Sequence, residues 1–247
     1  MGRSRRRYPG VPEDPAGILL VDKPSGMTSH DVVDRVRRQF RLQKVGHGGT
    51  LDPQATGLLV LLIGRGTKLS QRVMGHDKTY EGSMRLGVIT DSQDADGTVL
   101  EERDYRLVEE SSVHGVMRGF VGDQQQIPPM VSAVKIKGVP LYKMARKGEE
   151  VEREPRFIHV YEFRILSFEP PLVHFVLRCT KGTYVRTLCA DVGEALGCGA
   201  MLESLRRTQS GNLDVANARS LEEVLEMSRE KLEETITPLK QLISTEF

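Results

Sequence analysis

Apolar residues along the chain fall into runs and alternations that predict β-strands. Two continuous apolar runs have the length of buried strands, and another segment is apolar or small at every second position. A further pair of strands is expected on either side of the Pro170-Pro171 turn. The predicted strands cover residues 18–21, 58–63, 80–88, 157–168 and 172–179.

Helices are predicted where apolar residues recur every three or four positions. They are expected over residues 28–40, 107–121, 183–197 and 220–235. Thr28 with Asp31, and Ser220 with Glu223, have the spacing of capping boxes, which satisfy the first N–H groups of a helix. Thr183 is expected to cap the third of these helices.

The order of these elements predicts an α+β fold. Strands and helices mix without strict βαβ alternation, and we expect a mixed, largely antiparallel sheet flanked by helices. Residues 1–16 are rich in arginine and proline and are expected to form a disordered basic arm. The main domain is expected over residues 17–212, followed by a helical tail over residues 213–247. Within the domain, residues 128–156 show little periodicity, which indicates an irregular insertion.

The charge balance of the chain gives only a weak indication of its partners. The 247 residues contain 35 Lys and Arg against 34 Asp and Glu, a net charge of +1. Basic residues nevertheless cluster in three places, at residues 3–7, 35–44 and 135–147. Such patches permit RNA or DNA binding without requiring it, because solvated faces give similar clusters.

The cysteines and the apolar segments limit the class of protein. Cys179, Cys189 and Cys198 are odd in number and lack metal-ligand spacing, which argues against disulfides and against a zinc site. No apolar run approaches the roughly 20 residues of a membrane span. The basic N-terminus lacks the apolar region of a signal peptide. We therefore expect a reduced, cytoplasmic protein.

Several familiar catalytic and binding motifs are missing from the sequence. There is no Gly-Lys-Ser/Thr phosphate-binding loop. The acidic turn at residues 91–97 has Ser92 and Arg103 where a calcium loop requires an aspartate and a glutamate. Ser132 and Lys135 match S-x-x-K, but the companion motifs of serine acyl-transfer enzymes are absent. We expect a site without metal or cofactor.

A glycine-rich loop carries a single carboxylate into a predicted buried strand. Residues 46–57 read GHGGTLDPQATG, with Asp52 near the centre. The glycines allow backbone conformations and close approaches that side chains prevent, and a loop on a rigid scaffold can present a reactive group. The same sequence is also compatible with an Asp-Pro turn in which the aspartate only caps its own backbone. The rest of the chain has to decide between them.

Four segments together resemble one enzyme family. They are DKPSGMTSHDVV at 22–33, VGHGGTLDPQATGLL at 45–59, KTYEG at 78–82 and KGTYVRTL at 181–188. Three more stretches fit the same family, at residues 87–97, 127–151 and 197–211. With these motifs in order from about Gly17 to Asn212, the chain resembles the TruB-type tRNA pseudouridine-55 synthases.

The resemblance implies an isomerase. Such an enzyme detaches uracil from its ribose and rejoins it through C5, which gives pseudouridine in the T-loop of tRNA, and it needs no cofactor. Asp52 corresponds to the essential catalytic aspartate. A carboxylate can act as a nucleophile toward the sugar or base, or as the base that removes a ribose proton on the way to a glycal intermediate. The sequence leaves both routes open.

Three further residues match active-site positions of the family. Tyr80 corresponds to a tyrosine that stacks on uracil and is placed for proton transfer at C5. Arg186 corresponds to an arginine that pairs with the catalytic carboxylate, and His47 to a histidine beside the flipped nucleotide. Arg186 also falls in the first turn of a predicted helix, where a cation opposes the helix dipole by about 0.3–1 kcal/mol. A purely structural residue would not favour that position.

The remaining matches concern RNA binding. Tyr184 and Leu205 match positions that line the uracil pocket, and Lys23 lies in the motif that braces the catalytic loop. For Leu205 and Lys23 a packing role fits nearly as well. Residues 128–156 match a thumb-like loop that closes over the T-arm, where basic side chains would meet phosphates. The basic residues expected to do so include Lys135 and Arg146.

Departures from the family pattern and alternative functions accompany the resemblance. Gly48 stands where the family usually has threonine, which should loosen the loop. The residues after Gly211 are too few for the PUA-type RNA-binding domain of many relatives, so we expect RNA affinity to rest on the catalytic domain, its thumb-like loop and the basic arm. We also expect a monomer. A non-catalytic tRNA-binding or tRNA-folding protein on the same scaffold is the alternative, and the same chemistry on another RNA is a third.

Overall fold

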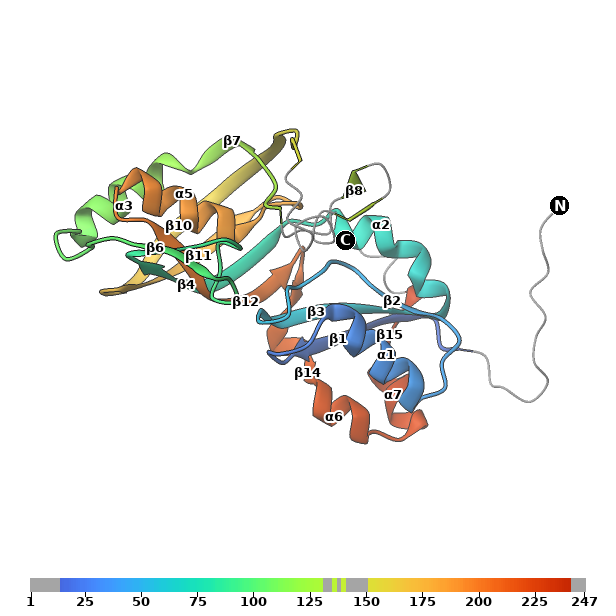
Figure 1. Cartoon of the computed structure of the whole chain (residues 1–247). Coiled ribbons are helices and arrows are strands. Elements are labelled where there is room, and N and C mark those ends of the chain that lie inside the picture. Colours follow the sequence, from blue (N-terminus) through green and yellow to red (C-terminus); the bar gives the residue numbers. More distant parts are fainter. Residues whose placement is uncertain (1–13, 131–134, 137–138, 141–150, 241–247) are drawn as a thin grey trace.

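The computed structural model describes residues 14–130, 135–136, 139–140 and 151–240, and its main feature is an eleven-stranded mixed sheet (Figure 1). The strands of this sheet are β1 (Gly17–Lys23), β2 (Val45–His47), β3 (Thr56–Ile63), β4 (Lys78–Leu86), β7 (Gly122–Gln126), β10 (Arg156–Glu169), β11 (Leu172–Cys179), β12 (Ala200–Ser210), β13 (Leu213–Asp214), β14 (Arg219–Ser220) and β15 (Thr237–Pro238). In space they run β14-β1-β3-β12-β4-β11-β10-β7, with β2 paired to β3, β13 to β12 and β15 to β1.

Two further strand pairs lie outside that sheet. They are β5 (Val88–Thr90) with β6 (Val99–Glu102), and β8 (Lys135–Ile136) with β9 (Val139–Pro140). Within the large sheet, the β1–β14 and β3–β12 pairs are parallel and the other neighbours are antiparallel. The structure therefore confirms the α+β fold with a mixed, largely antiparallel sheet.

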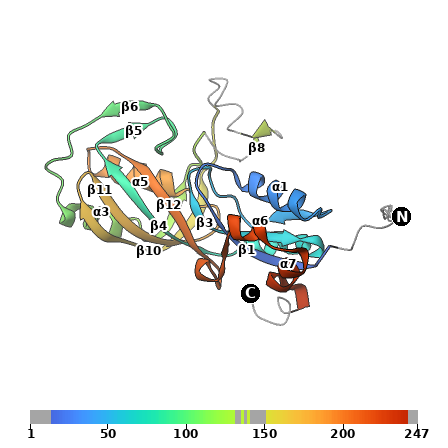
Figure 2. The same ribbon diagram turned by 90° about the horizontal axis from the view of Figure 1, so that it is seen from below.

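Helices cover the sheet in two groups, one on each half (Figures 1 and 2). The helices are α1 (Ser29–Gln39), α2 (Ser70–Met74), α3 (Glu110–Gly119), α5 (Val185–Ala195), α6 (Leu221–Glu226) and α7 (Arg229–Thr235), with 3₁₀ turns η1 (Gly64–Leu69) and η2 (Val215–Asn217). α3 and α5 pack on β10 and β12, whereas α1 and α6 pack on β2 and β1. One apolar cluster contains residues from both halves, and a smaller one surrounds Val60 and Val73.

Most predicted strands are present with shifted ends. Continuous apolar runs correctly located β1 and β3, and the alternation over residues 80–88 divides into β4 and β5 at Gly87, whose φ is +85°. The prediction missed β12, although this strand pairs with β4 along most of its length and with β3 near its middle. Polar residues interrupt the apolar alternation that would predict this strand. Two of them are Arg206 and Arg207, which are stabilised by Asp22 and by the carbonyl of Leu58, both distant in sequence.

The structure corrects the start of the helix predicted over residues 183–197. Thr183 is not its cap, because the Thr183 hydroxyl donates to the carbonyl of Thr180 at 2.9 Å. The N-cap residue is Tyr184, and no side chain caps the helix there. α5 therefore begins at Val185, one residue later than a Thr183 cap would place it.

The helix predicted over residues 220–235 is divided in two. Ser220 forms the predicted capping box at the start of α6. The backbone then becomes extended at Met227 and Ser228, with ψ values of 150° and 164°, and the Ser228 hydroxyl accepts the N–H of Lys231 to cap α7. At the other end of the chain, the predicted capping box of Thr28 with Asp31 is present in α1.

The segments predicted as arm, insertion and tail are described only in part. Residues 1–13 and the larger part of 131–150 lie outside the described residues. Asp14 is held against the body, since its carboxylate accepts the backbone N–H groups of Gln43 and Lys44 at 3.0 and 2.9 Å. The tail contains α6 and α7 and also β14 and β15, which both pair with β1. Among the described residues, no helix is long and apolar enough to cross a membrane.

Candidate active site

The loop between β2 and β3 presents Asp52 to solvent. The Asp52 side chain keeps 53% of its accessible surface, whereas the neighbouring Leu51 is buried. Ser29, at the start of α1, holds that neighbour: the Leu51 N–H donates to the Ser29 hydroxyl at 2.8 Å, and the hydroxyl lies 3.1 Å from the Leu51 carbonyl. On the other side, the Ala55 N–H donates to the Asp52 carbonyl. The backbone around the carboxylate is therefore fixed while the carboxylate itself remains accessible.

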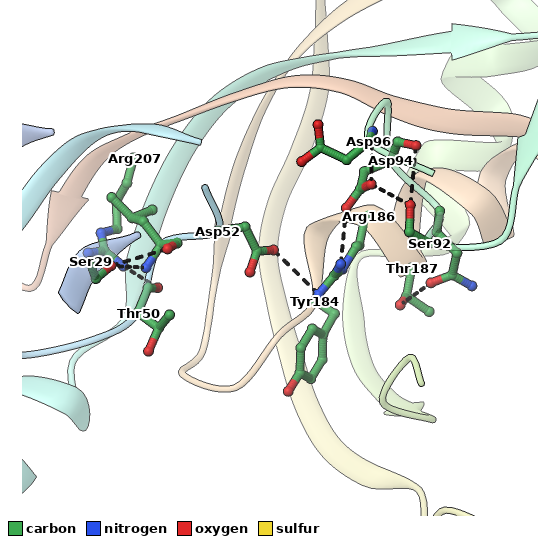
Figure 3. A network of polar contacts seen from close by, with 12 residues as sticks. Ser29, Thr50, Asp52, Ser92, Asp94, Asp96, Tyr184, Arg186, Thr187 and Arg207 are labelled. Carbon is green, nitrogen blue, oxygen red and sulfur yellow. Dashed lines mark hydrogen bonds and ion pairs between the residues drawn. The ribbon is translucent and has the colours of Figure 1, made fainter. Parts of the chain in front are cut away.

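Asp52 faces a buried arginine at the start of α5 (Figure 3). Arg186 Nη2 lies 3.4 Å from Asp52 Oδ2, and Nη1 lies 3.0 Å from Asp94 Oδ2. The Arg186 side chain is only 6% exposed, so its charge is removed from water and balanced by two carboxylates. The structure thus brings Asp52 and Arg186 together from distant parts of the sequence, with a second aspartate on the same cation.

Asp94 is a site residue that the sequence analysis missed. It lies in the acidic turn between β5 and β6, where its carboxylate also accepts the Ser92 hydroxyl at 2.5 Å and the Asp96 N–H at 3.2 Å. In the sequence this turn fails the pattern of a calcium loop, and no local motif marks Asp94. The one signal that pointed here was the likeness of residues 87–97 to the family, which marked the segment and not the residue.

Arg186 lies in the first turn of α5, as predicted, although the cap is a different residue. The two carboxylate partners offset the unfavourable interaction of its charge with the helix dipole. Tyr184 lies directly before the helix, with its N–H donating to Gln126 Oε1 at 2.7 Å and its carbonyl accepting Gln126 Nε2 at 3.0 Å. The guanidinium carbon of Arg186 is 5.9 Å from the centroid of the Tyr184 ring. Gln126, at the end of β7, therefore fixes the point where α5 begins.

Tyr80 lies on β4 beside β12, and only 9% of its surface is exposed. Burial raises the pKa of the Tyr80 hydroxyl to about 12, although the positive charge of Arg207 acts in the opposite direction. The negative charge of Asp52 adds a smaller contribution to the increase. At neutral pH the phenol therefore keeps its proton and can donate a hydrogen bond close to the catalytic loop.

Lys23 is fully buried and contacts the loop that carries Asp52. Its amino group donates to the carbonyls of Pro24, Met27 and Pro53 at 2.9, 2.6 and 2.9 Å. Pro53 directly follows Asp52, so the ammonium links two loops beside the Asp52 carboxylate. Burial lowers the pKa of the Lys23 amino group to about 8, and the charge of Asp52 opposes this decrease.

Lys23 leads to a prediction about stability and pH. Its pKa is about 8 in the folded protein against an ordinary value of 10.5, so between these values the unfolded chain binds more protons than the folded one. Its contribution to the free energy of unfolding should therefore increase as the pH rises from about 8 toward 10.5. Denaturant unfolding of wild type and Lys23→Met over this range measures the contribution as a difference. A difference that does not change with pH would contradict the prediction.

His47 lies on β2 opposite Leu61 of β3, close to the start of the catalytic loop. Burial is the main cause that lowers the pKa of its imidazole below the usual 6.5, while a hydrogen bond with the Gly49 backbone acts in the opposite direction. At neutral pH the ring is therefore uncharged. An uncharged, half-buried ring is suited to contact a base and not a phosphate.

Gly48 is closely packed and not loose, contrary to the expectation from the sequence. A Cβ atom at this position would lie 2.2 Å from Cγ1 and 2.9 Å from Cβ of Val73, on α2. The Gly48 N–H donates to the carbonyl of Val60 at 2.8 Å, so the backbone cannot move away freely. Val73 of this chain occupies the space that a threonine at position 48 would need.

This contact predicts a coupled pair of substitutions. Gly48→Ala should destabilise the protein by about 1–3 kcal/mol, because an added methyl group overpacks the site. In the Val73→Ala background the same change should cost less, with a coupling energy of about 0.5–3 kcal/mol. Denaturant unfolding of the four proteins measures it, and Gly115→Ala is a matched control because a Cβ there meets nothing within 4 Å. Strict additivity would show that Val73 does not determine the residue at position 48.

A cavity of about 660 Å³ opens beside the catalytic loop. Its walls include Gln54 and Thr56 from that loop, Asp96 from the acidic turn, and Leu205 from β12. The volume is within the range of small-molecule sites. Leu205 therefore lines a space large enough for a nucleoside, and the residues that line this space include neither Asp52 nor Arg186.

The structure locates only part of the predicted RNA-contacting set. Arg146 and the side chain of Lys135 lie outside the described part of the chain, so their contacts with phosphates stay a prediction. At the base of the insertion, Arg153 Nη1 donates to the carbonyl of Pro128 at 3.2 Å. This bond joins the two ends of the segment predicted as a thumb-like loop.

Family models match the chain over most of its length. The model of the TruB family pseudouridylate synthase (N terminal domain) matches residues 37–185, and that of the tRNA pseudouridylate synthase B C-terminal domain matches residues 186–244. Similar curated proteins named tRNA pseudouridine synthase B come from Opitutus terrae and Geobacter sulfurreducens. The first is 52% identical over 91% of this chain and 93% of its own length, and the second is 50% identical over 86% and 70%.

Solved structures share the fold at lower identity. A chain in a Cbf5-Nop10-Gar1 complex has a TM-score of 0.72 and 28% identity, covering 97% of this chain and 68% of that one. A chain in an H/ACA RNP bound to a substrate RNA containing 2'-deoxyuridine has a TM-score of 0.68 and 26% identity, covering 91% and 60%. This chain therefore spans about three fifths of the latter protein. The likeness includes both halves of the sheet.

Proposed function

This chain belongs to the TruB family of pseudouridylate synthases, and from that membership we propose that it converts uridine to pseudouridine in tRNA, at position 55 of the T-loop. The observation that carries the proposal is the accessible Asp52 carboxylate held 3.4 Å from the buried Arg186. Relatives named tRNA pseudouridine synthase B are about half identical to this chain over most of its length.

Asp52 is the group that reacts with the nucleotide. The reaction breaks the bond from the ribose to N1 of uracil and forms a bond from the same ribose carbon to C5. Asp52 acts either as a nucleophile toward the sugar or base, or as the base that takes a ribose proton. Either route needs an ionised carboxylate in a fixed orientation. The ion pair with Arg186 favours the charged form and fixes the orientation.

Tyr80 acts after the uracil has rejoined the ribose. C5 then carries both its original hydrogen and the new bond to the sugar, so that hydrogen must leave as a proton. A phenol whose pKa is raised to about 12 is neutral at physiological pH, so its oxygen can take the C5 proton only as its own O–H proton passes to solvent water. Its ring offers a face on which the uracil can stack.

The target base must leave its stack to reach Asp52. In this proposal the uncharged His47 supports the emptied stack, and Tyr184 and Leu205 line the base pocket. Lys135 and Arg146 contact phosphates of the T-arm and position it without reading its sequence. The enzyme acts as a monomer in the cytoplasm.

The alternative, a non-catalytic tRNA-binding or tRNA-folding protein on the same scaffold, accounts for less of the site. A binding protein needs a basic surface. It does not need an accessible carboxylate that is paired with a buried arginine. The cost of burying Arg186 between Asp52 and Asp94 favours catalysis. The same chemistry on a second RNA remains compatible with all of these contacts.

Tritium release from C5-labelled uridine in a T-arm stem-loop tests the proposal, because C5 loses its hydrogen only if the base is isomerised. We expect one tritium released for each RNA converted, and mapping of tRNA from cells lacking the gene should show loss of pseudouridine at position 55. Tight binding without release would favour the non-catalytic alternative. Release with position 55 unchanged in such cells would assign the chemistry to another RNA.

A further inference from the structure

Arg207 is a buried cation that neither the sequence analysis nor the catalytic roles above explain. It lies in β12 and only 2% of its surface is exposed. The strand register places it between Gly57 of β3 and Tyr80 of β4. It is therefore located where the strand that follows the catalytic loop meets the strand that carries the tyrosine.

The guanidinium donates to both ends of the catalytic loop. Nε lies 2.8 Å from the carbonyl oxygen of Leu58, while Nη1 and Nη2 lie 3.3 and 3.2 Å from those of Thr50 and Gly49. Figure 3 shows Arg207 on the side of the loop opposite Arg186. Asp52 lies between these attachment points along the chain, so one side chain connects the entrance and the exit of its loop.

The glycines of the loop make this approach possible. A Cβ atom at Gly57 would lie 2.3 Å from the carbonyl oxygen of Arg207, and Gly57 has a φ of +97°, which other residues rarely adopt. Gly49 has a φ of +144°, which other residues also rarely adopt, whereas a Cβ there would make only an ordinary van der Waals contact with Nη1 of Arg207, at 3.6 Å. The absence of a side chain at Gly57 is thus explained by the close approach of the Arg207 backbone.

The contacts of Arg207 differ from those of an ordinary buried ion pair. Among the described residues, Arg207 forms hydrogen bonds with three carbonyl oxygens and with the Tyr80 hydroxyl, and no ion pair with a carboxylate. Burying a charge without a counter-ion is costly, and a planar fork with several N–H groups is the side chain that can span three carbonyls at once. Lysine carries the same charge on one nitrogen, so it would have to replace from a single point the contacts that Nε, Nη1 and Nη2 of Arg207 make from three.

We propose that Arg207 is a positioning residue for the isomerisation: it holds residues 49–58 so that the Asp52 carboxylate meets Arg186 on one side and the target nucleotide on the other. This inference rests on the proposed function. A displacement of about 1 Å at a reacting group can reduce turnover on the order of 10²-fold. Binding of the T-arm should change much less, since the three carbonyls are occupied and the side chain is buried.

The test compares Arg207→Lys with Arg229→Lys. Arg229 is a matched control because it also donates to a carbonyl, that of Phe40 at 2.7 Å, but it joins α7 to the end of α1. We expect kcat for tritium release to fall on the order of 10²-fold in Arg207→Lys, with KM for the stem-loop changed by less than about threefold. Arg229→Lys should lower the melting temperature and leave kcat unchanged.

Two further measurements separate positioning from loss of fold. Hydrogen exchange of the peptide covering residues 49–58 should accelerate in Arg207→Lys and not in Arg229→Lys, and methylguanidinium should restore part of the turnover of Arg207→Ala. Unchanged kcat in Arg207→Lys, or a parallel change of kcat, KM and melting temperature, would overturn the inference. An inactive wild-type enzyme would instead overturn the proposed function, and the exchange measurement would still decide whether Arg207 holds the loop.

Discussion

Asp52→Asn is expected to abolish tritium release from C5-labelled uridine while T-arm binding stays within about threefold of wild type. Asparagine keeps the shape of the side chain, but it can neither attack the sugar or base nor accept a ribose proton. The loss should be on the order of 10³-fold or more, as expected when the reacting group itself is removed. Single-turnover release at saturating stem-loop and a filter-binding titration measure the two quantities.

A matched substitution serves as the control for Asp52→Asn. Asp123→Asn also removes one carboxylate from a polar contact, but Asp123 is an exposed residue of β7 whose Oδ1 lies 2.6 Å from Nδ1 of His159. That variant should release tritium at the wild-type rate. Robust turnover by Asp52→Asn would overturn the assignment of Asp52, and loss of binding in that variant would show that the carboxylate is needed to hold the RNA.

Arg186→Gln should have the second largest effect, and it should reduce both turnover and stability. Removing the cation leaves the carboxylates of Asp52 and Asp94 facing the same space without a counter-charge. Breaking a fully buried ion pair costs about 3–5 kcal/mol in the free energy of unfolding, and the cost here should be lower because the Asp52 side chain is 53% exposed and solvated. We expect turnover to fall on the order of 10²-fold or more, because the orientation of Asp52 is lost as well. Denaturant unfolding and single-turnover assays measure the two effects.

The double variant Arg186→Gln with Asp94→Asn separates stability from catalysis. Removing the charge of Asp94 should recover part of the stability, since one uncompensated carboxylate is gone. Turnover should stay low, because Asp52 still lacks the guanidinium that orients it. Recovery of turnover in the double variant would mean that Arg186 serves only to neutralise Asp94, which would contradict the role given to its contact with Asp52.

Asp52, the aspartate proposed to react, could be singled out from the sequence, but its surroundings could not. Asp52 lies in a local motif, so its loop and the following strand can be predicted from residues that are adjacent in sequence. Asp94 has no such signal, because its role depends on an acidic turn that contacts α5 from a distant part of the chain. An isolated aspartate in an acidic turn is indistinguishable by sequence from one that caps its own backbone.

Gly48 shows the same limit for packing. The sequence indicated that this residue departs from the family pattern, and the natural expectation was a looser loop. The reason for the departure lies in Val73, a buried residue of α2 that occupies the space of the missing side chain. A substitution that is compensated across the fold cannot be interpreted from its own neighbours.

The sequence by itself determined the local features of this protein: the apolar strands β1 and β3, the capped starts of α1 and α6, and the family to which its motifs belong. These features depend on residues a few positions apart, where apolar periodicity and capping act directly. The tertiary structure alone decided that β12 lies at the centre of the sheet and that Arg186 joins Asp52 to Asp94. It also decided that Arg207 holds the catalytic loop. The physical reason is that polar residues in a core are stabilised by partners distant in sequence, and no local pattern records those partners.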